Sequence, residues 1–166
     1  MPIVYLLLGV QGSGKSTWAI ANAERLNAVI LSSDTIRNEL VARGQGAEAD
    51  NGDRVFAIFN KRLEQLLTEG QNVISDATHA RRAWRKDEIA IARRLGAKVF
   101  GVWFYVPLVA CRQRNASRKG NVWGEQAVPD KFLLEVARGF EGPGEGEFDE
   151  VWRVREGGQR IASHNE

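Results

Sequence analysis

The residues from Gly9 to Ser16 have the types and spacing of a phosphate-binding loop. They fit the pattern G-x-x-x-x-G-K-[ST] and directly follow the apolar run Ile3–Leu8. Glycines let the backbone curl until successive N–H groups point at phosphate oxygens, an approach that Cβ atoms would obstruct. Lys15 then reaches the β- and γ-phosphates, and the Ser16 hydroxyl holds magnesium. We therefore predict that ATP with Mg²⁺ binds at Gly12, Ser13, Gly14, Lys15, Ser16 and Thr17.

A carboxylate ends the third apolar run of the chain. Asp76 closes the segment Val73-Ile74-Ser75-Asp76, which has the pattern of a buried strand. In phosphate-loop proteins, an acid at the end of such a strand holds magnesium or positions water. Asp76 could also cap the helix that follows, and the two roles are compatible.

Asp34 and Arg37 follow the second apolar run, Ala28–Leu31, at the start of an expected helix. Residues three apart on a helix share one face, with Cβ atoms about 5–6 Å apart. A carboxylate beside an acceptor hydroxyl can take its proton, and a guanidinium one turn on can clamp an anionic group of the same substrate. The alternative is a capping Asp34 in an ordinary ion pair with Arg37. The expected place beside the phosphate loop favours the catalytic interpretation.

Arg114 and Arg118 lie one helical turn apart in the segment after Pro107. Phosphoryl transfer uses cations over the γ-phosphate, so both arginines are candidates for that role, Arg118 above all. The alternative is a solvated helix face, which fits Arg112 better than Arg118. A GTPase is disfavoured because the guanine-reading N/T-K-x-D pattern is absent from the sequence. A dinucleotide site is disfavoured because Thr17 stands where its third glycine belongs.

Strand-like and helix-like segments alternate along the chain, which predicts a three-layer α/β fold with a central parallel sheet. The expected strands are Ile3–Leu8, Ala28–Leu31, Asn72–Ser75 and Lys98–Tyr105, with Val151–Arg155 at the edge. The expected helices are Lys15–Leu26, one with apolar residues from Val55 to Leu67, one with a buried stripe of Trp84, Ile91 and Leu95, and two in a helical lid over about 107–140. Residues after Glu156 read as a frayed tail.

Length and composition favour a single domain over residues 1–166. The net charge is only +2, but basic residues cluster over 81–86 and 112–119, which permits an anionic substrate. Cys111 is the only cysteine, so an intrachain disulfide and a four-cysteine zinc site are excluded. The N-terminal apolar run is too short to cross a membrane and lacks a basic leader. We therefore expect a cytoplasmic protein without membrane contact.

Together these motifs resemble the 5′-hydroxyl polynucleotide kinase domain of phage and bacterial nucleic-acid end-repair enzymes. The resemblance spans about Ile3 to Val154 and rests on Gly9–Thr17, Ser33-Asp34-x-x-Arg37, Asp76-Ala77-Thr78, Arg114-Asn115-x-x-Arg118 and Val128-Pro129. It implies a P-loop kinase fold in which Asp34 is the general base on the 5′-OH and Arg37 binds the next phosphate. It further implies that Arg114 and Arg118 bind the nucleotide, that Val128 lies under adenine, and that Asp76 and Thr78 join the acceptor site.

One departure from the family concerns the lid. There, Val-Pro follows the lid arginine within a few residues, whereas here Lys119–Ala127 intervene and carry Trp123. The sequence thus predicts an ATP- and magnesium-dependent kinase acting on 5′-OH ends of DNA or RNA, and the family implies a possible homo-oligomer. A small-molecule kinase on the same scaffold, acting on a sugar, nucleoside or drug, is the rival enzyme. It needs Asp34 but has no inherent need of Arg37 as a phosphate clamp. The rival of another class is a nucleotide-binding switch without phosphotransfer.

Overall fold

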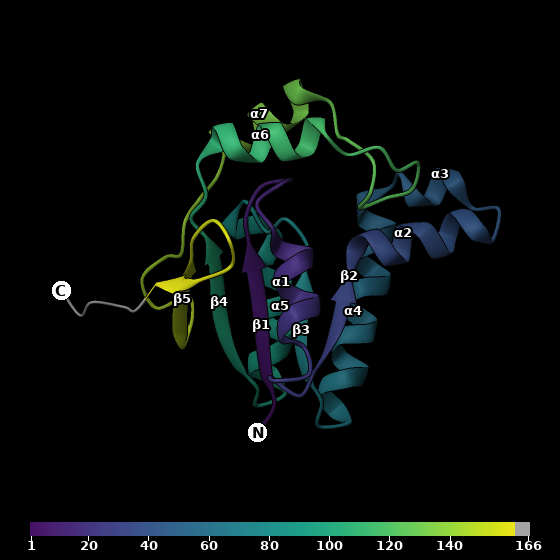
Figure 1. The fold of residues 1–166 in the computed structure, drawn as a ribbon. Helices are drawn as coiled ribbons and strands as arrows, with labels where there is room; N and C mark the ends of the chain where they lie inside the picture. Colours follow the sequence, from purple (N-terminus) through teal and green to yellow (C-terminus); the bar gives the residue numbers. More distant parts are fainter. Residues whose placement is uncertain (162–166) are drawn as a thin grey trace.

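The computed structural model describes residues 1–161, in which a central sheet carries helices on both faces (Figure 1). Within these residues six strands lie in the order β2-β3-β1-β4-β5-β6. All neighbouring strands are parallel except β5 and β6. The strands are β1 (Ile3–Leu8), β2 (Ala28–Ser32), β3 (Asn72–Asp76), β4 (Lys98–Phe104), β5 (Glu150–Val154) and β6 (Arg160–Ile161). The predicted α/β fold with a largely parallel sheet is confirmed.

The helices of the described part form the outer layers and a lid. They are α1 (Lys15–Asn22), α2 (Ser33–Ala42), α3 (Gly46–Ala49), α4 (Gly52–Thr68), α5 (Arg82–Arg94), α6 (Leu108–Ala116) and α7 (Asp130–Arg138). Alternate residues of β1 face two separate cores. Leu6 and Leu8 pack with the apolar faces of α4 and α5, whereas Tyr5 and Leu7 pack with Trp18 of α1. Both faces of β1 are apolar because helices cover both.

The lid helices α6 and α7 lie across the edge of the sheet where the parallel strands end (Figure 1). Asn115 of α6 joins the lid together, because its side-chain Nδ2 donates to the Val128 carbonyl (2.8 Å) and its Oδ1 accepts from the Val128 N–H (3.0 Å). The lid also touches the phosphate loop. Gly12 has a φ of +79°, and a Cβ there would overlap the Cys111 carbonyl oxygen of α6. Only glycine therefore fits this contact between lid and loop.

Two element boundaries differ from the sequence prediction. Helix α1 ends at Asn22, not Leu26, because the chain turns to enter β2 and the Ala28 N–H donates to the Ala23 carbonyl (2.9 Å). The expectation of a frayed tail after Glu156 is wrong for Arg160–Ile161, which pairs antiparallel with β5. The rest of that tail, 162–166, lies outside the described residues.

The expected buried stripe of α5 is wrong at Trp84, whose side chain is 50% exposed. Ile91 and Leu95 do pack against the core. The buried face of the helix instead includes Arg85 and Glu88 together with Ile89 and Ala92, although sequence patterns place arginine and glutamate at the surface.

Arg85 belongs to a buried polar network behind β3. Its Nη1 donates to the His79 carbonyl (2.9 Å), and its Nη2 donates to the Glu147 carboxylate (2.8 Å). Glu88 accepts a hydrogen bond from the Ser75 hydroxyl (2.6 Å) and lies 2.8 Å from Nε2 of His79. Because its guanidinium is buried and paired, Arg85 does not contribute to the basic surface that the sequence predicted over 81–86.

We expect Arg85→Ala to lower the free energy of unfolding by about 3–5 kcal/mol, because it leaves Glu147 without its buried partner. Burial raises the pKa of Glu147, but hydrogen bonds from Arg85 and the Gly144 N–H outweigh it and hold that pKa below its usual range. This stabilisation is therefore present above the pKa of the unfolded chain and is lost as the pH falls through the lower folded value. Urea unfolding at several pH values measures it. Lys86→Ala on the exposed face of α5 is the control, and equal losses from both variants would contradict the assignment.

Candidate active site

A cavity of about 500 Å³ lies between the phosphate loop, α2, α4, α5 and the lid. Its wall combines residues that are far apart in the sequence. Of the predicted site residues, it includes Lys15, Ser16, Asp34, Arg37, Asp76, Thr78, Arg118 and Val128. The others, Gly12, Ser13, Gly14, Thr17 and Arg114, lie outside this wall. The cavity therefore joins the expected phosphate, metal and acceptor groups in one space.

The phosphate loop has the backbone shape that its glycines allow. Gly12 and Gly14 both have left-handed φ values, +79° and +95°, and Gly14 is the N-cap of α1. The loop is anchored to the end of β3, because the Gly9 N–H donates to the Thr78 carbonyl (3.2 Å). Lys15 curls back so that its Nζ donates to the Val10 carbonyl (3.0 Å). Burial lowers the pKa of Lys15, while Asp76 and Asp34 act in the opposite direction.

Ser16 and Asp76 form a pair of oxygen ligands suited to magnesium. The Ser16 hydroxyl donates to Oδ2 of Asp76 at 2.8 Å. Asp76 does not cap α5, because the N-cap of that helix is Arg81. No group of three or more acidic, histidine or cysteine side chains that could hold a metal occurs within residues 1–161. Mg²⁺ is commonly held by one or two protein ligands together with substrate phosphates, so this pair fits it.

Asp34 is half-buried in the first turn of α2 and is not used to cap that helix. The capping residue is Ser32, whose side chain accepts from the Thr35 N–H (3.4 Å). Asp34 and Arg37 form no ion pair within 4.0 Å in the described structure, so the simple surface-pair interpretation does not apply. Burial and the charge of Asp76 raise the pKa of Asp34, with only partial compensation from Arg37, Lys15 and Arg118. A carboxylate with a raised pKa is a stronger base than an ordinary aspartate.

Arg37 is already engaged by protein groups. Its Nη1 donates to the Ala49 carbonyl (2.6 Å), and its guanidinium carbon lies 4.7 Å from the centroid of the Trp123 ring. Asp34 and Arg37 both line the cavity, as their spacing on α2 predicted. However, an acceptor phosphate would have to compete with these two contacts for the Arg37 guanidinium.

The inserted lid segment 119–127 covers the predicted general base. Asn38 of α2 holds it by two hydrogen bonds, one from its Nδ2 to the Trp123 carbonyl (3.0 Å) and one from the Trp123 N–H to its Oδ1 (2.9 Å). Gly124 has a φ of +87°, and a Cβ there would lie 3.3 Å from Oδ2 of Asp34. We call this pairing the Asn38–Trp123 clasp. Sequence reasoning missed Asn38, and the only available signal was the length of the insertion.

We expect Asn38→Ala to release the inserted segment. Two hydrogen bonds of about 1 kcal/mol each are lost, so opening should become about 30-fold more frequent. Trypsin cleavage at Arg118 and Lys119, which border the segment, reports this in the absence of any substrate. Asn38→Asp retains the oxygen that accepts from Trp123 and should give an intermediate rate. Unchanged cleavage in Asn38→Ala would show that the clasp does not hold the lid.

The two lid arginines have different surroundings. Arg114 donates to the Gly12 carbonyl (3.4 Å) and pairs with Glu156 (3.0 Å). Arg118 lies just beyond the C-terminus of α6, in the following turn, and its guanidinium forms no ion pair within the described residues. Arg112 pairs with Asp130 (2.7 Å) on the exposed side of the lid, as the solvated-face interpretation expects. Arg118 is therefore the lid arginine available to a ligand in the cavity.

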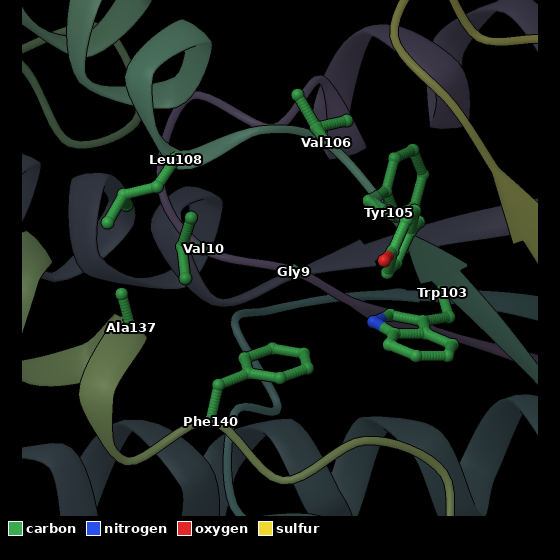
Figure 2. Close-up of a pocket in the computed structure, with 9 residues that line it drawn as sticks. Gly9, Val10, Trp103, Tyr105, Val106, Leu108, Ala137 and Phe140 are labelled. Carbon is green, nitrogen blue, oxygen red and sulfur yellow. The ribbon is translucent and has the colours of Figure 1, made fainter.

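A second, smaller cavity of about 160 Å³ lies between Gly9 and Val10 of the phosphate loop, the end of β4 and the lid. Figure 2 shows Val10 of the loop facing Leu108, Ala137 and Phe140 of the lid. No lysine, arginine or acidic side chain lines this cavity, so it does not suit a triphosphate. The apolar residues around it form the contact between the phosphate loop and the ends of helices α6 and α7.

The large cavity also has wall residues that the sequence did not predict as site residues. This wall carries four aromatic residues and two carboxylates that were not singled out as site residues. They are Phe56, Trp84, Trp123 and Phe132, with Asp53 and Asp87. Nothing in their local sequence marks them, because they come from three helices and the inserted segment.

A model named AAA_33, an AAA domain, matches residues 4–143. The chain belongs to this AAA domain family. Within residues 1–161, none of the helices combines the length and apolarity needed to span a membrane. The search of curated proteins gave no match.

Solved structures with the same fold include several kinases. A candidate kinase from Chloroflexus aurantiacus superposes with a TM-score of 0.75 at 16% identity, covering 93% of this chain and 88% of the other. A gluconokinase from Sinorhizobium meliloti has a TM-score of 0.62 at 20% identity, covering 95% and 83%. The APS kinase CysC of Mycobacterium tuberculosis, solved with AMPPNP and APS, has a TM-score of 0.59 at 20% identity, covering 95% and 90%. This AAA-family chain thus has the fold of small P-loop kinases.

Proposed function

We propose that this protein is a magnesium-dependent kinase that transfers the γ-phosphoryl group of ATP to a hydroxyl of a small molecule. The observation that carries the proposal is the single cavity in which Lys15, the Ser16–Asp76 pair and Arg118 meet the unpaired carboxylate of Asp34. A nucleotide-binding switch needs the first groups but has no need of a general base.

The proposed reaction uses Asp34 as the general base. The acceptor oxygen attacks the γ-phosphorus while its proton passes to the Asp34 carboxylate, and the bond from the γ-phosphorus to the bridging oxygen breaks to release ADP. Lys15 and Arg118 neutralise charge on the transferring group, and Ser16 and Asp76 would hold the metal. When bound, Mg²⁺ supplies charge neutralisation on the β- and γ-phosphates. Trp123 and Gly124 cover Asp34 and limit the access of water to the base.

Two observations favour a small acceptor over a nucleic-acid end. The Arg37 guanidinium, which would bind the acceptor phosphate, already contacts Ala49 and Trp123. The basic segment 81–86, which permits an anionic substrate, is partly structural, since Arg85 is buried against Glu147. A 5′-hydroxyl polynucleotide kinase remains the second candidate, because Asp34 and Arg37 share the cavity wall as that activity requires.

Thymidine and its 3′-monophosphate distinguish the two candidates as acceptors from labelled ATP. If Arg37 binds an acceptor phosphate, the 3′-monophosphate should be better by about 10–150-fold in kcat/KM, and Arg37→Ala should remove that difference. A small-molecule kinase should show no such preference and should phosphorylate members of a panel of sugars, nucleosides and amino alcohols. Preferred transfer to the 3′-monophosphate and to 5′-OH oligonucleotides would overturn the small-molecule proposal. Slow ATP hydrolysis without any phosphorylated acceptor would favour the switch.

We expect Arg118→Lys to recover less than a tenth of the activity lost in Arg118→Ala. Lysine keeps the charge but not the planar pair of donors, and arginines placed on transferring phosphoryl groups contribute about 10³–10⁵-fold to kcat. Single-turnover transfer measures the chemical step. Arg112→Lys, on the exposed face of the lid, is the control. Full activity of Arg118→Lys would argue against a bidentate contact.

A further inference from the structure

We propose that the acceptor of this kinase carries a positive charge, as an alkylamine or a quaternary ammonium group, bound between Asp53 and Asp87 against the aromatic wall of the cavity. The inference rests on the proposed function for the transfer step. The cation site itself is defined by residues that play no part in that step.

Two helices present the same pair of side-chain types to the cavity. Asp53 and Phe56 are three residues apart on α4, and Trp84 and Asp87 are three residues apart on α5. Residues at this spacing share one helix face, so each helix offers a carboxylate beside an aromatic ring. Phe132 of the lid completes this wall. The cavity thus combines the two kinds of group that bind organic cations, negative charge and aromatic surface.

The two carboxylates have no partner among residues 1–161. Neither Asp53 nor Asp87 forms an ion pair within 4.0 Å or a side-chain hydrogen bond there, although Arg54, the neighbour of Asp53, pairs with Glu48. The aromatic groups are equally open, since the side chains of Trp84 and Phe132 are 50% and 48% exposed. Large apolar side chains exposed together in one cavity commonly mark a binding surface.

The aromatic faces of this wall already accept cations within the chain. The guanidinium of Arg37 lies 4.7 Å from the ring centroid of Trp123, and that of Arg81 lies 5.4 Å from the ring centroid of Trp84. Both distances fall within the roughly 6 Å over which a ring attracts a cation. Both rings therefore have a guanidinium over one face in this structure.

The charges of the cavity wall differ between the phosphate loop and helices α4 and α5. Lys15 and Arg118 line the end near the phosphate loop, where the triphosphate is expected. Helices α4 and α5 add the carboxylates of Asp53 and Asp87 to the wall, and neither helix adds a lysine or an arginine. An acceptor with further phosphate or carboxylate groups would meet like charge there, whereas a cation is attracted. The structure therefore favours an amine-bearing hydroxyl compound over a phosphorylated or acidic one.

A binding experiment tests the cation site without any transfer. Benzyltrimethylammonium chloride is titrated into the full chain, with NaCl as the ionic-strength match and benzyl alcohol as the uncharged probe, and tryptophan fluorescence reports binding near Trp84 and Trp123. We expect saturable quenching by the ammonium probe, weakened about fivefold or more in Asp53→Asn/Asp87→Asn. Asp53→Glu/Asp87→Glu keeps the charges and should retain binding. Glu24→Gln/Glu69→Gln removes the same charge from exposed residues outside the cavity wall and should bind as the wild type does.

Absence of saturable quenching, equal binding of benzyl alcohol, or equal binding by a folded Asp53→Asn/Asp87→Asn variant would overturn the proposal. Thermal unfolding checks the fold of each variant. Transfer assays with 2-amino-1-phenylethanol and glucosamine, each beside its N-acetyl derivative, then separate the two proposals. If the neutral derivatives are phosphorylated at the same rate as the amines, the preference for a charged acceptor is wrong, but the proposed kinase activity stands. If the ammonium probe binds through Asp53 and Asp87 but no hydroxyl compound is phosphorylated, the cation site stands and the proposed kinase activity is wrong.

Discussion

Asp34→Asn is expected to lower kcat by about 10²–10⁴-fold with little change in the affinity for ATP. The amide keeps the size of the side chain, but it cannot take the proton of the acceptor hydroxyl. Asp34 lines the cavity and lies beneath the covering Gly124, yet within the described residues its side chain forms no hydrogen bond or ion pair with Ser16 or any other group of the phosphate loop. Steady-state kinetics with both substrates varied separates the two effects. Normal turnover with a raised KM for ATP would instead place Asp34 on the metal side.

The pH profile gives the same assignment a second test. Burial and the nearby Asp76 raise the pKa of Asp34, so the protonated, inactive form persists to a higher pH than for an ordinary aspartate. The rate should therefore fall as the pH drops through this raised pKa, at values above the usual range near 3.9. The residual activity of Asp34→Asn should lack this acid limb. Asp50→Asn, an exposed carboxylate outside the cavity wall, should keep it.

The parts of the site that the sequence predicted are those encoded by short, contiguous patterns. The glycines of the phosphate loop, the serine after Lys15 and the acid at the end of β3 each have a fixed place relative to a strand. Parallel strands bring their carboxyl ends to one edge of the sheet, so the sequence alone predicts that Asp34 and Asp76 lie near one another. Apolar periodicity likewise located β1, β3 and the core face of α4.

The features that the sequence did not predict depend on partners distant in the chain. The sequence predicts Arg85 at the surface, because its carboxylate partner Glu147 lies 62 positions further along the chain. The local pattern predicts Trp84 in the core, because it cannot show that Arg85 and Glu88 are among the buried residues of α5. Asn38 has no local signal, since the backbone that it holds lies 85 positions away at Trp123. Residue spacing predicts which side chains share a face of one helix or strand, whereas these contacts join different elements.

Lys15→Ala is expected to lower kcat by more than about tenfold, a loss of over about 1.4 kcal/mol in transition-state stabilisation. Lys15 is the one lysine of the cavity wall in the described structure, and its Nζ is held over the loop by the Val10 carbonyl. A triphosphate would offer that ammonium stronger, charged acceptors than a carbonyl. Single-turnover transfer of labelled phosphate measures the loss. Retention of more than a tenth of the wild-type rate would contradict the phosphate-loop assignment.

Nucleotide binding supplies the independent measurement for the same variant. Because a ligand that binds the folded state alone raises the unfolding temperature, ATP with Mg²⁺ should stabilise the wild type more than Lys15→Ala. Lys61→Ala, an exposed lysine of α4 outside the cavity, should respond like the wild type. The unliganded variant should keep its unfolding temperature to within a few degrees, since only one hydrogen bond to Val10 is lost. A large drop without ligand would mean that Lys15 supports the loop itself, and the kinetic loss would then no longer measure a contact with phosphate.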